Sequence, residues 1–417
     1  MTLSTAATLS PVHGGLSAPV DRIVQADPAW NGLPRIEVNE NDRTSLYRIA
    51  DGTLSPLEGP MGEIDYRSVL MRAAIERKGK SWAWTVPIVL PVTAAEAANC
   101  APGQSVALAF VENVFGKLEI ESVFDWDKDA FIRSVYGTER HDHAGAGLWL
   151  SDERTKLVGG KIHLAPFRDE RRFAKRILSP RATRALIEEK GYEQTVAFQT
   201  RNPLHRAHEY ALVYGAECIL RETGKKTGVF LNPLVGQLKG DDVPADTRMR
   251  TYETLIDQRY IGQGDLDEEL WKAKGQDLNE QIHLAGLDIR MYYGGPKEAV
   301  MHAIYRQNLG FTHFIIGRKH ADAPYADGSP IWGDFDAQEI FGKLGGALSI
   351  STVNVGFAAY FEELGRVGLT SDNQGKTMVS ISGTKMREIL GKGELPDDRV
   401  MRPSTAKILA AYYRKPE

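Results

Sequence analysis

The chain has few of the features that mark secreted, disulfide-stabilised or membrane proteins. It contains two cysteines in 417 residues, Cys100 and Cys218, and they form no CxxC pair. This excludes a disulfide framework and a cysteine zinc site, and it predicts a reducing compartment. The most apolar runs, Thr85–Val92 and Val106–Val111, are far shorter than the roughly 20 residues that a membrane-spanning helix needs.

The chain also lacks an excess of charge of either sign. Its 51 basic and 55 acidic residues give a net charge of −4, which argues against a nucleic-acid partner. We interpret the one basic run, Arg168–Arg184, as a solvated linker or helix face. The N-terminal residues lack the charged and apolar regions of a signal peptide, so we expect a cytoplasmic protein with no membrane partner.

What the chain does contain is ample apolar material, since 42% of its residues are hydrophobic. This excludes disorder of the whole chain, and the length suggests about two or three domains. Up to about residue 175, short apolar runs such as Ser81–Val92 and Ser105–Val114 are separated by Pro and Gly. That spacing predicts a β-rich, barrel-like N-terminal domain.

After Ser179 the pattern changes to strands that alternate with helices. Ser179-Pro180 begins a helix that Gly191 ends, and Gln194–Phe198 is a buried strand followed by a helix from near His205. Further strands are expected at Gly228–Val235, Leu284–Tyr292 and Phe311–Ile316, with helices from Asp246 to about Ile261 and from Pro296 to Leu309. The alternation predicts a parallel sheet that binds its ligand at the carboxyl ends of the strands.

The first candidate segment, QTRNPLHRAH from Gln199 to His208, lies where a strand passes into a helix. His205 and His208 share one face of the first helical turn, whose free N–H groups and dipole attract phosphate. Arg201 offers a planar fork to an oxyanion, and Gln199 and Asn202 add neutral donors. The histidines could also be half of a metal site or ordinary histidines, but no third ligand lies nearby in sequence, so we expect no bound metal.

Two further segments follow the same logic. Gly317-Arg318-Lys319-His320-Ala321 comes directly after a buried strand, where a glycine lets a ligand approach the backbone. In ISGTKMR, Ser382 or Thr384 can cap a helix that runs to about Leu390, and Arg387 can reach the same anion. Taken alone, the first of these two segments is better explained as an ordinary charged loop, and the second is equally compatible with a plain capped helix.

Taken together, QTRNPLHRAH, GRKHA and ISGTKMR resemble the motifs of the sulfate adenylyltransferase (ATP sulfurylase) family. The resemblance covers most of the chain and includes Val135–Thr138, Gly295-Pro296 and Asp336–Phe341. It implies an α/β protein in which a Rossmann-like nucleotidyltransferase domain (176–345) lies between a β-rich N-terminal domain (1–175) and a small α/β C-terminal unit (346–417).

The reaction that the resemblance implies converts ATP and sulfate to adenosine 5′-phosphosulfate (adenylyl sulfate) and diphosphate. Sulfate would attack the α-phosphate directly and in line. Because sulfate is already an anion, the chemistry needs positioning and charge stabilisation rather than an activated side chain. The resemblance also implies Mg²⁺ that arrives with ATP, no tightly bound cofactor, and a homo-oligomer.

The resemblance further implies a role for each matching position. Sulfate would be held by Gln199, Arg201 and the backbone N–H of Ala321. The family's catalytic positions fall on Thr200, Arg201, Asn202, His205 and His208. ATP would contact Gln199, Thr200, Arg201, Asn202, His205, His208, Gly317, Arg318, Lys319, His320, Tyr360 and Arg387.

The chain departs from the family pattern in the second motif, because Lys319 and Asp322 replace the Asp and the last Gly of GRDHAG. This moves a positive charge next to the nucleotide. A fused adenylylsulfate kinase is not expected: Gly79-Lys80-Ser81 and Gly375-Lys376-Thr377 lack the first glycine of a phosphate-binding loop, and about thirty residues follow Arg387.

The same residues argue against two alternative functions. A related adenylyltransferase with an organic phosphate acceptor would need more basic residues than Arg201 supplies. A non-catalytic nucleotide-binding regulator would be expected to have lost His205, His208 or Arg201, and all three are present.

Overall fold

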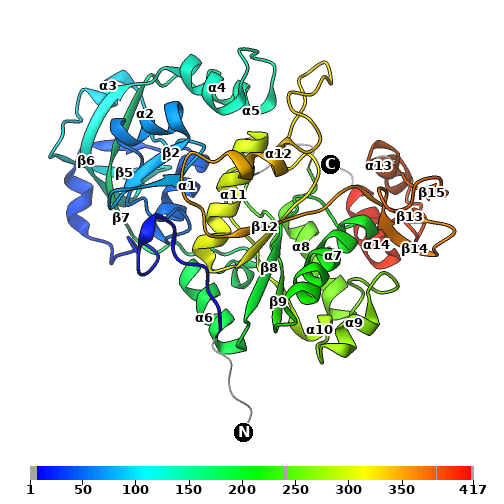
Figure 1. Ribbon diagram of the computed structural model, residues 1–417. Helices are drawn as coiled ribbons and strands as arrows, with labels where there is room; N and C mark the ends of the chain where they lie inside the picture. Colours follow the sequence, from blue (N-terminus) through cyan, green and yellow to red (C-terminus); the bar gives the residue numbers. More distant parts are fainter. Residues whose placement is uncertain (1–6, 238–241, 382, 415–417) are drawn as a thin grey trace, which may run out of the picture.

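The computed structural model describes residues 7–237, 242–381 and 383–414. Its centre is a five-stranded parallel sheet with the strand order β10-β9-β8-β11-β12 (Figure 1). The strands are β8 (Gln194–Phe198), β9 (Thr227–Leu231), β10 (Ile282–Leu284), β11 (His313–Ile316) and β12 (Ser351–Asn354). This confirms the parallel sheet that the alternation of strands and helices predicts.

Helices cover both faces of this sheet. On β8, Val196 belongs to one hydrophobic core with Leu212 of α7 (Arg206–Thr223), and its neighbour Ala197 belongs to the other core. That second core contains Ile187 of α6 (Pro180–Lys190) and much of α11 (Gly295–Leu309). Successive strand residues point to opposite faces, so each face of the sheet is covered by a hydrophobic core.

Both ends of α6, the start of α7 and the end of α11 are confirmed, whereas the helix predicted to run to about Ile261 ends at Asp257. The Ser179 hydroxyl accepts the N–H of Ala182 at the start of α6, and Gly191 ends that helix in the left-handed conformation with φ 63°. α7 begins directly after His205, and α11 ends at Leu309. These ends are encoded locally, by a capping hydroxyl and by a glycine that tolerates positive φ.

Two sequence predictions in this region are wrong. The expected strand Leu284–Tyr292 overlaps β10 at Leu284 alone. Beyond it, Gly286 and Leu287 form isolated bridges, and the rest is a loop. Asp246 does not cap α8 (Ala245–Asp257); it lies in the first turn, where its carboxylate pairs with Arg172 at 2.6 Å. In addition, β12 lies beyond residue 345, so the parallel sheet extends past the boundary that the sequence predicts.

The N-terminal part is mixed α/β rather than mainly β. Its largest sheet has the order β1-β5-β6-β7-β4, with β1 and β4 at the edges, and β2 pairs with β3. The strands are β1 (Arg35–Glu37), β2 (Ala74–Arg77), β3 (Lys80–Ala83), β4 (Pro91–Val92), β5 (Ser105–Phe110), β6 (Asn113–Asp125) and β7 (Lys156–Leu164). The helices are α1 (Glu40–Ala50), α2 (Glu63–Arg72), α3 (Ala94–Ala97), α4 (Lys128–Tyr136) and α5 (Ala144–Leu150). The capping box of Asn39 and Asp42 was the signal for α1.

The C-terminal part combines a three-stranded antiparallel sheet, β14-β13-β15, with two helices. Its elements are β13 (Ala358–Phe361), β14 (Arg366–Leu369), β15 (Met378–Val379), α13 (Gly383–Gly391) and α14 (Pro403–Tyr413). Met386 and Leu390 of α13 pack with Leu409 of α14. Ser382, one of the two expected caps of α13, lies outside the described residues, and so does the side chain of Thr384.

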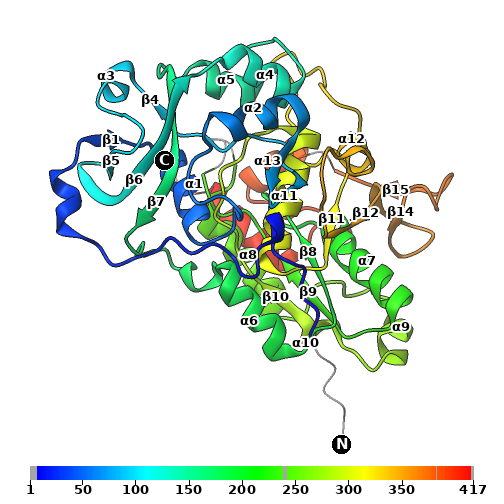
Figure 2. The same cartoon turned by 60° about the vertical axis from the view of Figure 1, so that its left-hand side comes forward.

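Smaller helices fill the connections of the parallel sheet. They are α9 (Glu268–Ala273), α10 (Leu278–Gln281) and α12 (Asp336–Glu339). Figures 1 and 2 agree in placing α4 and α5 at the opposite end of the molecule from α9 and α10. In the described part of the chain, no helix combines the length and the apolar character needed to cross a membrane.

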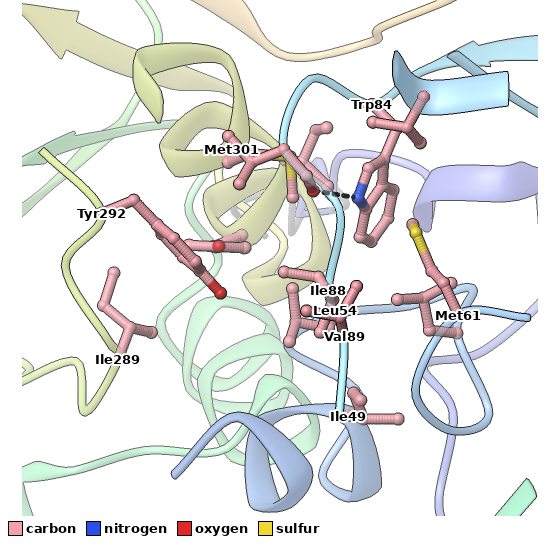
Figure 3. Packing of buried hydrophobic residues seen from close by; sticks show 14 of the residues in the cluster. Ile49, Leu54, Met61, Trp84, Ile88, Val89, Ile289, Tyr292 and Met301 are labelled. Atoms are coloured by element: carbon pink, nitrogen blue, oxygen red, sulfur yellow. Dashed lines mark hydrogen bonds between the residues drawn. The ribbon is translucent and has the colours of Figure 1, made fainter. Parts of the chain in front are cut away.

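The N-terminal part and the parallel sheet share one hydrophobic core through α11. Figure 3 shows Ile49, Trp84 and Ile88 packed in one cluster with Tyr292 and with Met301 of α11. The far end of α11 adds hydrogen bonds: the Asn308 amide donates to the backbone carbonyls of Thr53 at 3.0 Å and Ser55 at 2.9 Å. The two parts therefore cannot separate without exposing apolar surface and buried polar groups.

His13 lies in this shared core and makes folding sensitive to acid. Its ring is buried beside Trp82 and contacts the carbonyl of Ala83 at 2.8 Å through Nε2. Burial lowers the pKa of His13 to about 4. Because the unfolded chain has the ordinary histidine pKa near 6.5, it binds more protons than the folded chain between these values, and stability falls as the pH falls.

We predict that His13→Gln, which keeps a donor near the Ala83 carbonyl, reduces this acid sensitivity. Between pH 6.5 and 4.5, the free energy of unfolding should fall by about 2 kcal/mol more in the wild type than in the variant. Urea denaturation at the two pH values measures the difference. An identical loss in both proteins would show that His13 does not titrate on unfolding.

Candidate active site

The parallel sheet has a switch point between β8 and β11. From β8 the chain builds β9 and β10 on one side, and β11 and β12 then lie on the other side. At such a point the loops that follow two neighbouring strands diverge and leave a crevice at the carboxyl edge. A cavity of about 390 Å³ lies there, between the loops that follow β8 and β11.

Two of the three predicted segments meet in this cavity. The sequence-predicted residues that line it are Gln199, Thr200, Arg201, Asn202, His205, His208, Gly317, Arg318, Lys319, His320 and Ala321. Two predicted ATP contacts are not brought to it. Tyr360 lies on β13, where its ring is 5.2 Å from the Arg206 guanidinium, and Arg387 is exposed on α13.

The first loop is held in shape by hydrogen bonds to the backbone of Asn202. The Thr200 hydroxyl donates to the Asn202 carbonyl at 2.9 Å and accepts the Asn202 N–H at 3.1 Å. The Tyr252 hydroxyl of α8 donates to the same carbonyl at 2.7 Å. Arg201 lies between Thr200 and Asn202, so this fixed turn sets the direction of its side chain.

The two histidines stack on each other at the start of α7. Their ring centroids are 3.7 Å apart and their planes differ by 20°. Burial lowers the pKa of His205 to about 4 and that of His208 well below its ordinary value. At neutral pH both rings are therefore uncharged in the free protein and act as hydrogen-bond donors rather than as cations.

The N-terminus of α7 is less available to a phosphate than the sequence predicts. The Arg206 N–H donates to the carbonyl of Val400 at 2.8 Å, and the His208 N–H donates to that of His205 at 2.8 Å. Val400 comes from the C-terminal part, which no local sequence signal could reveal. The imidazoles, rather than the helix N–H groups, are the main donors at this end of the cavity.

Several buried polar atoms of the cavity lack hydrogen-bond partners in the described part of the chain. They are Gln199 Oε1, Arg201 Nη1, His208 Nδ1 and Asp322 Oδ1. Buried polar atoms are rarely left unpaired because each one costs free energy. Their gathering on one cavity indicates that a polar ligand completes the site. The Arg201 guanidinium also lies 5.3 Å from the ring of Tyr293.

The second loop presents its backbone in an uncommon conformation. Lys319 and Ala321 have φ of 50° and 57°, the left-handed region that non-glycine residues seldom adopt. The Ala321 carbonyl accepts the Gly295 N–H at 3.1 Å. The ammonium of Lys319, which replaces an acid of the family pattern, lies 3.5 Å from a carboxylate oxygen of Asp334.

Sequence reasoning missed several residues that line the cavity. They are Phe198, Ala207, Ala211, Met291, Ile315, Asp322 as a lining residue, and Val355–Ala358. The last segment follows β12, so its position at a strand end and its glycine, Gly356, were the available signals. Met291 lies on the loop mistaken for a strand, and nothing in its local sequence marks it.

Metal ligands are sparse in this region. In residues 7–237, 242–381 and 383–414, no three His, Cys, Asp or Glu side chains are grouped to hold a metal ion. Within the same residues, Asp322 is the one carboxylate that lines the cavity. This donor set suits a cation that is bound mainly by its own phosphate ligand, as Mg²⁺ commonly is.

The fold and the cavity define an α/β protein with a polar cavity at the switch point of its parallel sheet, and comparisons with known proteins place it in a family. A family model described as ATP-sulfurylase matches residues 174–412, and one described as a PUA-like domain matches residues 18–166. The chain belongs to the ATP-sulfurylase family, a family of nucleotidyltransferases, which confirms the resemblance of its motifs.

Curated relatives match over nearly the whole chain. The sulfate adenylyltransferase of Pyropia yezoensis is 66% identical over 98% of this chain and 98% of its own length. That of Synechococcus sp. (strain JA-3-3Ab) is 35% identical over 97% of both. A solved structure described as "Hexameric APS kinase from Thiobacillus denitrificans" superposes with a TM-score of 0.69 at 18% identity, over 97% of this chain and 69% of that one. This last match supports the fold alone.

Gly317 offers a test of where the ligand lies. A Cβ built at this residue meets no atom within 4 Å, although the residue lines the cavity. We predict that Gly317→Ala folds normally but weakens ATP binding about tenfold, because the added methyl group takes up ligand space. Equilibrium titration with ATP measures the effect.

Gly342→Ala is the matched control for Gly317→Ala. Gly342 is exposed, a Cβ there also meets no atom within 4 Å, and it does not line the cavity. Its ATP affinity and its thermal midpoint should both equal those of the wild type. Wild-type affinity in Gly317→Ala would show that ATP does not occupy this part of the cavity.

Proposed function

We infer that this chain forms adenosine 5′-phosphosulfate and diphosphate from ATP and sulfate, and we propose that the cavity at the switch point is where it does so. Membership of the ATP-sulfurylase family carries the reaction. The observation that carries the location is the buried, unpartnered Nη1 of Arg201 beside two stacked, uncharged imidazoles in one cavity.

In the proposed site, Arg201, Gln199 and the Ala321 N–H hold sulfate. Sulfate is a dianion that must approach another anion, so its main barrier is electrostatic repulsion. The Arg201 guanidinium, half-buried and facing a cavity that excludes part of the solvent, offsets this repulsion more strongly than a surface charge would. No general base is needed, because sulfate carries no proton at neutral pH.

The other end of the proposed site holds the phosphate chain of ATP. Asn202 orients the α-phosphate, while His205 and His208 donate hydrogen bonds to the leaving diphosphate. Burial keeps these rings neutral in the free protein. A bound polyanion favours the protonated form, so the rings can gain charge as negative charge builds on the leaving group. Thr200 keeps the turn between these groups in shape.

Sulfate and the α-phosphate then lie in one cavity with diphosphate opposite the nucleophile. We propose direct, in-line attack of a sulfate oxygen on the α-phosphorus, with no covalent enzyme intermediate. The nucleotide is bordered by Gly317, Arg318, Lys319 and His320. Its base lies beside the exposed residues Gly356 and Phe357. The Asp322 carboxylate, which lines the same cavity, would be placed to hold Mg²⁺ bound to ATP, and that ion would reduce the charge of the phosphates.

Contacts of ATP with Tyr360 and Arg387 require the C-terminal unit to move toward the cavity when ATP binds. We propose the division into 1–175, 176–345 and 346–417 with one change, at the second boundary, and a Rossmann-like nucleotidyltransferase domain in the middle. The position of β12 supports a second boundary beyond Asn354.

We also propose a homo-oligomer, since the structural neighbour is described as hexameric, and a cytoplasmic location, since both cysteines are free thiols.

Release of diphosphate from MgATP, measured with and without sulfate, tests the reaction directly. We predict release that depends on sulfate and saturates with it. Diphosphate release at the same rate with and without sulfate would contradict the proposed function.

Substitution of the proposed residues tests the location. Arg201→Ala and His205→Ala should each lower turnover about a hundredfold or more, the scale for loss of a group that stabilises developing charge. Both side chains border the cavity rather than fill a core, so thermal midpoints should change little. Near-normal turnover in either variant would place the reaction elsewhere.

A further inference from the structure

Helix α11 carries a stripe of polar side chains that the proposed mechanism does not use. Glu298, His302 and Arg306 are one helical turn apart, and each is fully buried. A buried polar side chain is tolerated only when its neighbours satisfy it. The contacts of this stripe lead from the core of the protein to the two loops of the site.

His302 touches one side chain from each loop that lines the cavity. Its Nδ1 lies 3.0 Å from Nε2 of Gln199, on the loop after β8. The same Nδ1 lies 3.0 Å from Nε2 of His320, on the loop after β11. One ring nitrogen therefore lies between the group proposed to hold sulfate and a group proposed to border the nucleotide.

The chemistry of these neighbours fixes the proton of the His302 ring. The amide nitrogen of Gln199 can only donate, so Nδ1 must accept. The proton of the neutral ring then lies on Nε2, which is 3.3 Å from a carboxylate oxygen of Glu298, an electrostatic contact without hydrogen-bond geometry. The reverse arrangement would direct the lone pair of Nε2 at that carboxylate, which is repulsive. Burial, with the nearby charge of Arg306, lowers the pKa of His302 and keeps the ring neutral.

Glu298 is itself fixed in place. Its two carboxylate oxygens accept the backbone N–H groups of Tyr292 at 2.8 Å and of Gly294 at 3.0 Å. Figure 3 shows the Tyr292 side chain in the shared hydrophobic core, so this loop is anchored by packing as well. The carboxylate cannot rotate without losing both backbone bonds, and it therefore sets the direction of His302 Nε2.

Gln199 depends on this contact more than an ordinary amide would. Its Oε1 is buried and has no hydrogen-bond partner in the described part of the chain. The amide is thus held from its nitrogen side, by His302. Without that acceptor, no hydrogen bond within the described residues fixes the rotation of the amide, and its N–H groups lose a set direction.

We propose that His302, oriented by Glu298, is a positioning residue for the reaction: through Nδ1 it fixes the Gln199 amide, whose second N–H is left for sulfate, and it sets the direction of the His320 ring. This inference rests on the proposed function of the cavity. It assigns a role in the reaction to a residue that contacts no substrate and lies inside a core helix.

The test compares His302→Leu with His302→Asn. Leu fills a similar volume but offers no acceptor, whereas the Asn oxygen lies near the former position of Nδ1. We expect His302→Leu to raise the KM for sulfate and lower kcat, with a combined loss of about tenfold to a hundredfold in kcat/KM. His302→Asn should recover most of this loss.

Gln307→Leu is the control for a purely structural effect. Gln307 is also fully buried on α11, but its partners are the backbone groups of Pro11, Ser349 and Ile350, away from the site. The Gln307→Leu variant should have a lower thermal midpoint and an unchanged KM for sulfate. An equal effect of the His302 and Gln307 variants on sulfate KM, or no recovery in His302→Asn, would overturn the proposal.

A second measurement does not depend on a folded Leu variant. In ¹⁵N spectra of histidine-labelled wild-type protein, the signal that disappears in His302→Asn should show a protonated Nε2 and an unprotonated Nδ1 from pH 6 to pH 8. A protonated Nδ1 would overturn the proposal. The Arg201→Ala variant separates the two claims: if it is inactive while His302→Leu is normal, the site stands and this inference fails.

Discussion

The structure depends on the burial of one helix that is not apolar. Nearly every residue of α11 is buried, including Glu298, His302, Arg306, Gln307 and Asn308. Such a helix is stable only if most of its polar groups find partners, and the partners come from three places. Asn308 and Gln307 bind backbone of the N-terminal part, Glu298 binds the loop after β10, and His302 reaches the two site loops. One helix thereby joins the domain interface to the cavity.

In the proposed site, a nearly neutral protein binds two polyanions without a general excess of positive charge. The net charge of −4 supplies no general attraction. The loops after β8 and β11 instead place Arg201, two imidazoles and backbone donors in one partly enclosed volume, where charges are screened less than in water. Lys319 adds less than its charge suggests, because Asp334 lies 3.5 Å from its ammonium. The neutral state of His205 and His208 leaves room for charge to develop only when a ligand arrives.

Local signals predicted the parts of this architecture that are determined locally. The cap at Ser179, the stop at Gly191 and the strand-to-helix junction at His205 each depend on a few neighbouring residues, and each is confirmed. The loop taken for a strand at Leu284–Tyr292 is apolar because it packs in the shared core, not because it pairs. The helices of the N-terminal part were hidden among Pro- and Gly-rich turns. Two contacts have no local signature. The N-terminus of α7 binds Val400, about 190 positions away, and His302 contacts Gln199, about 100 positions away.

The proposed function requires that both substrates meet in the cavity between the loops after β8 and β11. A crystal structure of the chain with adenosine 5′-phosphosulfate bound tests this requirement. We predict that the sulfate group lies within hydrogen-bond distance of Arg201 and the Ala321 N–H, with the α-phosphate beside Asn202 and the adenosine toward Gly356. Product bound elsewhere, for example in the arginine-lined cavity formed by Arg43, Arg48 and Arg168, would contradict it.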